Sequence, residues 1–170
     1  YSIEQAIQIY FSENLLGKRI AIQGAGSVGK RLAEYLASSG AHVFISDIDR
    51  SKLSDIDNHN ITCVDDAFSV ECDLFSPCAV GAIFTKDSIS NLKCKIIAGG
   101  ANNQLLEVSI AENLFKKGIV YIPDTLINSG GVIGLTKDYI KRNDTETEQA
   151  LRAIANRVKD LMIESQDSSI

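Results

Sequence analysis

Three glycines near the start of the chain have the spacing of a phosphate-binding turn. Gly24, Gly26 and Gly29 form a G-x-G-x-x-G segment that follows the apolar run 20–22 and opens a helical pattern. The first glycine permits a tight turn, the second lets a pyrophosphate approach the backbone, and the third lets the helix pack closely on the strand. The first amides of the helix, and its dipole, would then face the phosphates. The alternative is a glycine-rich turn that binds no ligand.

A carboxylate at the expected distance favours the ligand-binding interpretation. Asp47 ends the next apolar run, 42–46, about 20 residues beyond the glycines, where an acid is expected to hold the ribose hydroxyls of NAD. The same carboxylate would face the 2′-phosphate of NADP, so it disfavours that cofactor. Arg50 lies close by in the sequence and is the one residue that could weaken this preference.

Short apolar segments alternate with helical segments along the chain. This alternation predicts parallel strands with right-handed crossovers, and continuous apolar runs predict a sheet covered on both faces. The expected strands are 20–22, 42–46, 61–64, 72–75, 95–98 and 119–122. The expected helices are 2–12, 27–39, a short one within 51–60, 87–92, 106–117, one from about 125, and 145–165. The predicted fold is α/β: a single doubly wound, Rossmann-type NAD-binding domain over 1–170, with a mainly parallel sheet and flanking helices.

The last predicted helix, 145–165, is amphipathic. Thr145 and Glu148 have the spacing of a capping box at its start. Its apolar stripe consists of Leu151, Ile154, Val158 and Leu161. Such a stripe needs a partner surface, which is either this sheet or a further domain.

Composition and charge exclude several classes of function. A net charge of −5 without a basic cluster argues against a nucleic-acid surface, and no apolar run approaches membrane-spanning length. The four cysteines show no C-x-x-C spacing, so we expect no metal site but buried thiols in a reducing cytoplasm. The only methionine is Met162, and the N-terminus lacks the pattern of a signal peptide. We therefore expect a cytoplasmic protein, of which this chain is one piece; the alternative is a processed form that has lost its initiator methionine.

Small and polar residues follow three other predicted strands. They lie at 77–79, 99–103 and 123–124. In an open α/β sheet, ligands bind at the carboxyl ends of the strands, and small residues there would let a flat ring approach the backbone. Asn102 would offer its amide to a carboxamide or carboxylate. The alternative is that these are ordinary turn residues.

Several of these segments together resemble a known family. The segments are Gly24–Gly29, Cys72–Ala79, Ile97–Leu105, Tyr121–Asp124 and Asn128–Ile133. They look like the cofactor-binding half of the glutamate/leucine/phenylalanine/valine dehydrogenase family, most closely its leucine dehydrogenases. The resemblance spans roughly 2–142, and the Ala-Asn-Asn and Asn-x-Gly-Gly motifs are far more specific than the glycine fingerprint.

The resemblance implies NAD-dependent oxidative deamination of an L-amino acid to a 2-oxo acid and ammonia. The cofactor-binding residues that it implies are Gly24, Ala25, Gly26, Ser27, Val28, Gly29, Asp47, Ile48, Cys78, Ala79, Gly100, Ala101, Asn102 and Asn128. Val132 and Leu135 match two positions of the substrate pocket, although Leu135 could instead belong to the core. Glutamate dehydrogenases carry serine at the second position, and a buried leucine would leave a substrate carboxylate unpaired. An apolar amino acid is therefore favoured, while departures at Ser129 and Gly134 leave its identity open.

The family's catalytic lysines and aspartate match nothing in this chain. The resemblance places them in an N-terminal catalytic domain, so the catalytic residues are unknown here and expected outside the chain. We predict that this chain alone binds NAD without turnover, and that the full-length protein is a homo-oligomer. Two alternatives remain: a stand-alone NAD-binding or sensor module without catalysis, and another Rossmann enzyme, which the Ala-Asn-Asn motif disfavours.

Overall fold

The computed structural model describes residues 10–11, 14–79, 81–127, 133 and 139–167. The chain separates into two compact units, one formed by Leu15–Asp124 and the other by Tyr1–Asn14 with Thr125–Ile170. The predicted helix 2–12 lies outside the described residues except for Tyr10 and Phe11, which are helical.

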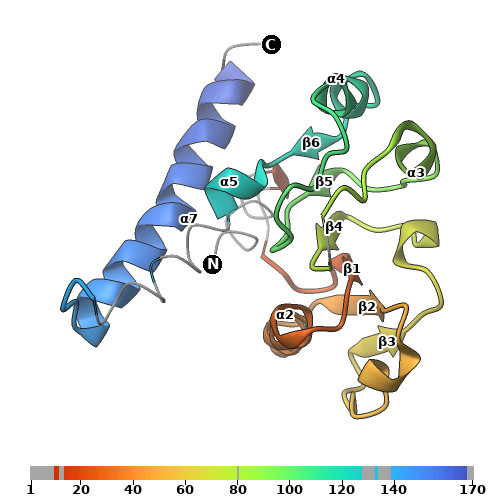
Figure 1. Ribbon diagram of the computed structural model, residues 1–170, viewed down its shortest axis with the longest axis horizontal. Coiled ribbons are helices and arrows are strands. Elements are labelled where there is room, and N and C mark those ends of the chain that lie inside the picture. The colour runs from red at the N-terminus through yellow and green to blue at the C-terminus, as the bar shows by residue number, and fades with distance from the viewer. Residues whose placement is uncertain (1–9, 12–13, 80, 128–132, 134–138, 168–170) are drawn as a thin grey trace. The chain divides into compact units, whose positions relative to one another are not determined.

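A six-stranded parallel sheet forms the centre of the larger unit (Figure 1). Its strands are β1 (Arg19–Gln23), β2 (His42–Ser46), β3 (Ile61–Cys63), β4 (Leu74–Pro77), β5 (Ile96–Ile97) and β6 (Val120–Tyr121). All five pairings are parallel, in the spatial order β3-β2-β1-β4-β5-β6. This is the strand order of the doubly wound dinucleotide-binding fold, so the predicted fold class is confirmed.

Helices follow most of the strands. They are α2 (Ser27–Ser38), η1 (Arg50–Leu53), η2 (Ala67–Ser69), α3 (Lys86–Ser90), α4 (Ser109–Lys116), α5 (Asp124–Ile127) and α7 (Asp144–Asp167), where η denotes a 3₁₀ turn. The helix α2 ends where the sequence predicts, since Gly40 adopts φ +91° and the Ala41 amide donates to the Leu36 carbonyl. In Figure 1, α2 lies on one side of the strands, and α3 and α4 lie on the other.

Both faces of the sheet are buried. On one face, Ala21, Phe75 and Ile97 of three neighbouring strands pack with residues of η2, α3 and α4 in one apolar cluster. Three aromatic rings support this cluster, with Phe75 4.7 Å from Phe68 and 5.8 Å from Phe84 between centroids. The alternate residues of the strands face α2, and Ile20 is fully buried there. The continuous apolar runs thus correspond to strands covered on both sides, as predicted.

Two boundaries differ from the sequence-based expectation. The fourth strand was expected at 72–75 with a turn from Ser76, but β4 runs to Pro77, which pairs with Gln23 of β1. Proline is tolerated here because the pairing of β4 with β5 ends at Phe75 and Ile97, so the missing N–H comes after the last pair of that ladder. The helix expected from 106 begins only at Ser109, because Leu105 still bridges to Phe84.

In the smaller unit, the long helix α7 begins with a capping box other than the predicted one. The Asn143 side chain accepts from the Glu146 amide, and the Glu146 carboxylate accepts from the Asn143 amide, both at 2.9 Å. Glu148, predicted as the capping partner of Thr145, instead pairs with Arg152 one turn later. The buried positions of α7 are Ala155, Val158 and Met162, so Val158 belongs to the buried face as predicted. Among the described residues, no helix is both long and apolar enough to cross a membrane.

Candidate functional site

The predicted site segments leave the sheet at one edge. In register, Gln23 lies beside Ser46 of β2 and beside Pro77 of β4, and Phe75 of β4 lies beside Ile97 of β5. The strands are parallel, so the segments that follow them emerge together at their carboxyl ends. The fold therefore brings together four predicted segments, 24–29, 47–48, 78–79 and 100–102.

Gly24 and Gly29 are required by packing within the protein. Gly24 has φ +107°, and a Cβ there would lie 2.7 Å from the Ala79 nitrogen. A Cβ on Gly29 would lie 1.9 Å from the Gly24 carbonyl oxygen. Since backbone atoms cannot rotate away as side chains do, both positions exclude larger residues. They fix the tight turn and the close contact of α2 with β1, as the fingerprint predicts.

Packing does not require the glycine at position 26. Gly26 has φ −74° and ψ −173°, which any residue adopts, and a Cβ there would meet no described neighbour within 4 Å. It is the N-cap of α2 and supplies no side-chain cap, so the first-turn amides are left for another acceptor. A pyrophosphate that needs close approach to these amides accounts for glycine here. This observation fits the predicted dinucleotide.

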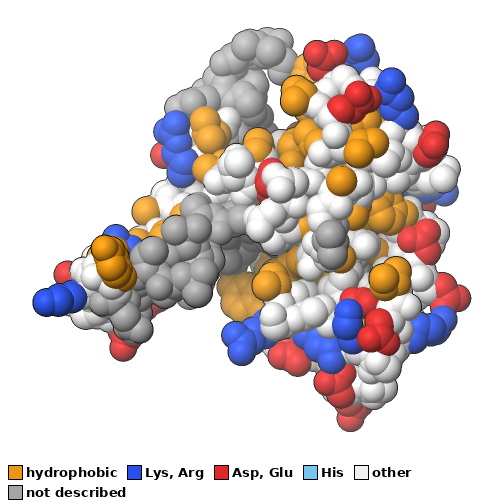
Figure 2. All heavy atoms as spheres, in the orientation of Figure 1, with side chains coloured by type: hydrophobic (Ala, Val, Ile, Leu, Met, Phe, Trp, Pro, Cys, Tyr) orange, Lys and Arg blue, Asp and Glu red, His pale blue; other side chains and the backbone are white. Residues whose placement is uncertain are grey.

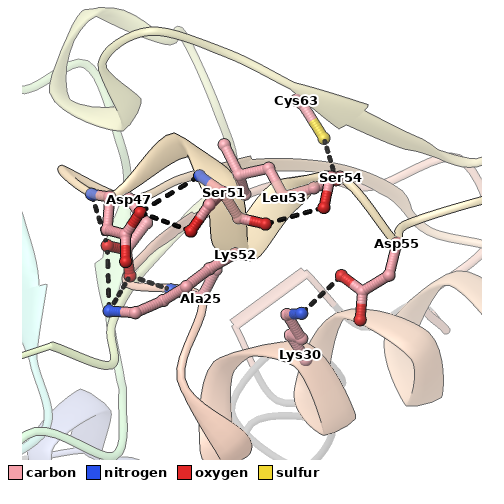
Figure 3. A network of polar contacts seen from close by, with 10 residues as sticks. Ala25, Lys30, Asp47, Ser51, Lys52, Leu53, Ser54, Asp55 and Cys63 are labelled. Carbon is pink, nitrogen blue, oxygen red and sulfur yellow. Dashed lines mark hydrogen bonds and ion pairs between the residues drawn. The ribbon is translucent and has the colours of Figure 1, made fainter.

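Asp47 follows β2 and faces the glycine turn (Figure 3). Its Oδ2 accepts from the Ala25 amide at 2.7 Å, and its Oδ1 accepts from the Asp49 amide at 2.9 Å. The Lys52 Nζ lies 3.2 Å from Oδ1 and 3.4 Å from Oδ2. Burial by itself raises the pKa of Asp47, but these two amides and the Lys52 ammonium outweigh it, so the pKa lies below its ordinary value. The carboxylate is therefore ionised and held in place, ready to accept from ribose hydroxyls.

A cavity of about 240 Å³ adjoins Asp47. It is lined by Gln23, Gly24, Asp47, Ile48, Ala79, Gly81 and Ile83. A site that encloses a whole drug-sized ligand has about 300–1,000 Å³, so this cavity suits one end of a dinucleotide. Four of the lining residues were predicted from the sequence. Gln23, Gly81 and Ile83 were missed, and only their nearness to predicted strand ends could have indicated them.

A second, larger cavity of about 490 Å³ lies at the opposite edge of the sheet. It includes Arg19 and Asp73, which precede or begin β1 and β4, and none of the predicted site residues. Asp73 is already engaged, since it accepts from the Arg19 amide at 3.0 Å and lies 3.5 Å from the Lys95 Nζ. Ligands of open α/β sheets bind at the carboxyl edge, so the smaller cavity is the better candidate.

Beyond the glycine turn, the end of β4 and the loop after β5 come close to the start of α2. Val28 is 55% exposed, and a Cβ on Gly100 would lie 2.9 Å from its Cγ1. The Ala101 amide donates to the Pro77 carbonyl at 2.9 Å. Burial raises the pKa of the Cys78 thiol, and bonds from the Gly100 amide and Ser76 only partly oppose it. The Cys78 thiol is therefore harder to ionise than an ordinary cysteine, which lowers its reactivity as a nucleophile.

The loop that contains Gly100, Ala101 and Asn102 is held from behind by a buried amide. The Gln104 side chain is fully buried, and its Nε2 donates to the Gly99 carbonyl at 3.0 Å and the Ala101 carbonyl at 2.8 Å. The Asp124 carboxylate accepts from the Asn103 amide at 2.8 Å. Sequence reasoning did not assign Gln104 a role, because a glutamine after a turn does not by itself indicate where its amide points.

Three predicted residues lie outside the described residues. They are Asn128 of the cofactor set and Val132 and Leu135 of the substrate pocket. Their roles remain predictions.

Two expectations were wrong. Arg50 pairs with Asp65, so the cation beside Asp47 is Lys52. All four thiols were expected to be buried, but Cys63 is exposed, Cys78 and Cys94 are partly exposed, and Cys72 is buried. The strand of Cys63, β3, is at the edge of the sheet.

Known proteins resemble the chain over most of its length. The family model described as glutamate/leucine/phenylalanine/valine dehydrogenase matches residues 45–168. A leucine dehydrogenase of Thermoactinomyces intermedius is 36% identical over 90% of this chain and 43% of its own length. A phenylalanine dehydrogenase of Lysinibacillus sphaericus is 38% identical over 92% of this chain and 45% of its own length. This chain thus spans less than half of the curated relatives that it matches.

Solved structures give the same result. L-tryptophan dehydrogenase from Nostoc punctiforme superposes with a TM-score of 0.92 at 31% identity, over 99% of this chain and 53% of that chain. A hetero-hexameric glutamate dehydrogenase from Thermus thermophilus, at 17% identity, shares the fold with a TM-score of 0.73 over 98% of this chain and 45% of that chain. The chain belongs to the glutamate/leucine/phenylalanine/valine dehydrogenase family.

Proposed function

We propose that this chain is the NAD-binding half of an amino-acid dehydrogenase that oxidatively deaminates an L-amino acid with an apolar side chain. The observation that supports the cofactor assignment is the glycine at position 26. Packing within the protein does not require a glycine there, whereas a bound pyrophosphate would. The proposed class of reaction is supported by the family to which the chain belongs and by the names of its relatives.

The start of α2 would hold the pyrophosphate. This helix has twelve residues and no acidic side chain in its first turn. Its orphan amides and the positive end of its dipole therefore face an anion without competition from a local carboxylate. Gly24, Ala25, Ser27, Val28 and Gly29 would shape this turn around the phosphates.

The cavity beside Asp47 would take the adenosine. Asp47 would accept hydrogen bonds from the ribose hydroxyls. Two backbone amides already hold its carboxylate in place, so the side chain would need to move little when the ribose binds. Ile48 is fully exposed and lines the cavity with Ala79 and Ile83. These apolar side chains suit the faces of an adenine ring.

The loop after β5 would flank the nicotinamide. Gly100 lies beside Val28 and Cys78, Ala101 and Asn102 follow it in the same loop, and the Gln104 side chain bonds to two carbonyls of that loop. When bound, NAD⁺ supplies the hydride acceptor at C4 of its nicotinamide. Asn128 is proposed to lie near the reacting carbon, as the family resemblance implies.

The substrate is proposed to be an L-amino acid with an apolar side chain. Relatives between 31% and 38% identical are named for leucine, phenylalanine and tryptophan, which all have apolar side chains. Val132 and Leu135 are proposed to line the side-chain pocket. In the overall reaction the amino acid, NAD⁺ and water give the 2-oxo acid, ammonium, NADH and a proton.

The groups that activate the amino acid are proposed to lie outside this chain. A lysine of lowered pKa would suit the steps at the amine and at water. Two lysines close in the sequence to the glycine turn and to Asp47 are already paired, Lys30 with Asp55 and Lys52 with Asp47. We also propose that the whole protein acts as a homo-oligomer.

The test has a binding part and a turnover part. Calorimetric titration of the 170-residue chain should show NAD binding, and the native polypeptide that contains this sequence should reduce NAD with leucine, phenylalanine or tryptophan but not glutamate. NAD binding without turnover on any amino acid would favour a sensor module. Absence of NAD binding would overturn the proposal.

A further inference from the structure

The loop after β5 is bonded to the segment that follows β4. The Ala82 amide donates to the Asn103 carbonyl, and the Phe84 amide donates to the Gln104 carbonyl at 3.0 Å. The segment after β4 also lines the cavity beside Asp47. Two parts of the chain that the proposed function places at opposite ends of the dinucleotide are therefore joined by backbone bonds.

This junction contains strained backbone. Asn103 has φ +52° and Ala82 has φ +58°, and they are two of the three non-glycine residues with a left-handed backbone in the described part of the chain. Asparagine tolerates this conformation, but alanine has no side-chain group that could offset the strain. Backbone strain of this kind persists only where the surrounding bonds hold it, and it occurs often at ligand sites. The bonds that hold Asn103 are therefore of functional interest.

Asp124 supplies one of these bonds. Its Oδ2 accepts from the Asn103 amide at 2.8 Å. The same carboxylate lies against the Tyr121 phenol. Burial and the Asp124 carboxylate raise the pKa of Tyr121 to about 12, and a bond from the Asp124 amide only partly opposes this. The phenol is therefore protonated at neutral pH and is a second donor to the carboxylate. Asp124 thus connects the loop after β5 to the end of β6.

We propose that Asp124 positions the loop after β5 for the nicotinamide half of the cofactor and has no part in binding the adenosine half. This inference rests on the proposed function, because it assumes that a dinucleotide binds at this edge of the sheet with its nicotinamide beside the loop. The carboxylate acts through the Asn103 amide and does not touch the ligand. Without it, Asn103 would lose a charge-assisted bond and could relax from its left-handed conformation, which would move Gly100, Ala101 and Asn102.

The adenosine cavity does not depend on this bond. The described residues that line it include none of the loop after β5. The segment after β4 has anchors of its own, since the Ser88 hydroxyl donates to the Ile83 carbonyl at 2.7 Å and Thr85 forms a capping box with Ser88 at the start of α3. Loss of the Asp124 carboxylate should therefore affect one end of the site only.

Asp73 provides a matched control. Its carboxylate accepts from the Arg19 amide at 3.0 Å, at the opposite edge of the sheet. Asp124→Ala and Asp73→Ala each remove one carboxylate that accepts from a backbone amide, and they change the net charge equally. Figure 2 shows acidic and basic side chains interspersed over the part of the surface near β2 and β3. Such a mixed surface has no strong overall field, so each replacement acts mainly through its own bonds.

Calorimetric titration of the 170-residue chain with NAD and with ADP-ribose tests the proposal. ADP-ribose has the adenosine and both phosphates but no nicotinamide, so we expect the wild type to bind NAD more tightly. Asp124→Ala should raise the Kd for NAD about five- to tenfold, as part of the lost charge-assisted bond is transmitted to the loop, and should change the Kd for ADP-ribose less than about twofold. Asp124→Asn keeps an acceptor for the amide and should recover part of the loss. Asp73→Ala should leave both Kd values within about twofold of the wild type.

The comparison of the two ligands separates positioning from general damage. A thermal melt of each variant verifies that it is folded at the temperature of the titration. If the wild type binds ADP-ribose as tightly as NAD, or if Asp124→Ala weakens both equally, the inference about Asp124 is wrong and the proposed NAD function stands. An Asp124→Asn variant as weak as Asp124→Ala would show that the charge acts on the cofactor directly, which also overturns the positioning role. If neither ligand binds to the wild type, the proposed function fails and the inference fails with it.

Discussion

Two glycines of the phosphate-binding turn should respond differently to replacement by alanine, one through stability and the other through NAD affinity. Gly29→Ala puts a Cβ 1.9 Å from the Gly24 carbonyl oxygen, and Gly26→Ala puts one where no described atom lies within 4 Å. We therefore expect Gly29→Ala to lower stability and Gly26→Ala to lower NAD affinity.

The stability loss at Gly29 can be estimated from its contact. Overpacking a close-packed site costs about 1–3 kcal/mol, and the upper end applies because the obstructing atom belongs to the backbone. Alanine inside a helix recovers about 1 kcal/mol relative to glycine. The net loss of about 2 kcal/mol should lower the melting temperature by roughly 4–8 °C in a domain of this size.

At Gly26 the stability terms nearly cancel. Alanine is a poorer N-cap than glycine by a few tenths of a kcal/mol or more, but it also restricts the unfolded chain by about 0.4–1 kcal/mol. The melting temperature should stay within roughly 3 °C of the wild type. A methyl group between the phosphate and the amides should remove about 1.5–3 kcal/mol of charged hydrogen bonding, which raises the Kd for NAD about 10- to 100-fold.

Differential scanning fluorimetry and calorimetric titration on the same two variants measure both quantities. The reasoning would be refuted if Gly26→Ala bound NAD like the wild type, or if it lost as much stability as Gly29→Ala. Wild-type stability in Gly29→Ala would show that α2 and β1 are not packed as closely as described.

Three other predictions concern buried groups. Gln104→Leu removes both bonds to the loop carbonyls, so it should lower stability by about 1–3 kcal/mol in a denaturant titration and weaken NAD binding; an unchanged NAD Kd would contradict its positioning role. Because the pKa of Asp47 lies below 3.8 in the folded chain, its stabilising contribution should be present above pH 4 and be lost as the pH falls through the lowered value. The unfolding free energies of wild type and Asp47→Asn should therefore converge in acid, and a constant difference would contradict this. Burial raises the pKa values of Cys72 and Cys94 to about 12, so iodoacetamide at pH 8 should label Cys63 first, as mass spectrometry of the digest would detect.

The sequence was sufficient for the fold because local patterns and global topology agree. Each predicted strand exists, and the two faces of the sheet are buried as the continuous apolar runs indicate. The errors occur where two local signals compete. Pro77 was assigned to a turn, yet it is the last residue of β4 and pairs with Gln23 of β1. Thr145 and Asn143 both precede a glutamate by three residues, and only the observed bonds distinguish them.

Sequence patterns predicted the site residues that backbone geometry requires. They did not predict which ion pairs the side chains form. Gly24, Gly29 and Asp47 follow from a spacing that the turn itself imposes. Arg50 is nearer to Asp47 in the sequence than Lys52 is, yet Arg50 pairs with Asp65, which follows the next strand, and Lys52 pairs with Asp47. No periodicity encodes that long-range pairing.

The residues of the proposed site differ in how strongly the fold requires them. The atoms that hold Asp47, the α2 turn and the loop after β5 are mostly backbone amides and carbonyls, together with the buried Gln104. Changing them would disturb the sheet edge. Lys52, in contrast, has a half-exposed side chain on a short 3₁₀ turn. The proposed dinucleotide site therefore consists mostly of groups that the fold itself requires, and Lys52 is not one of them.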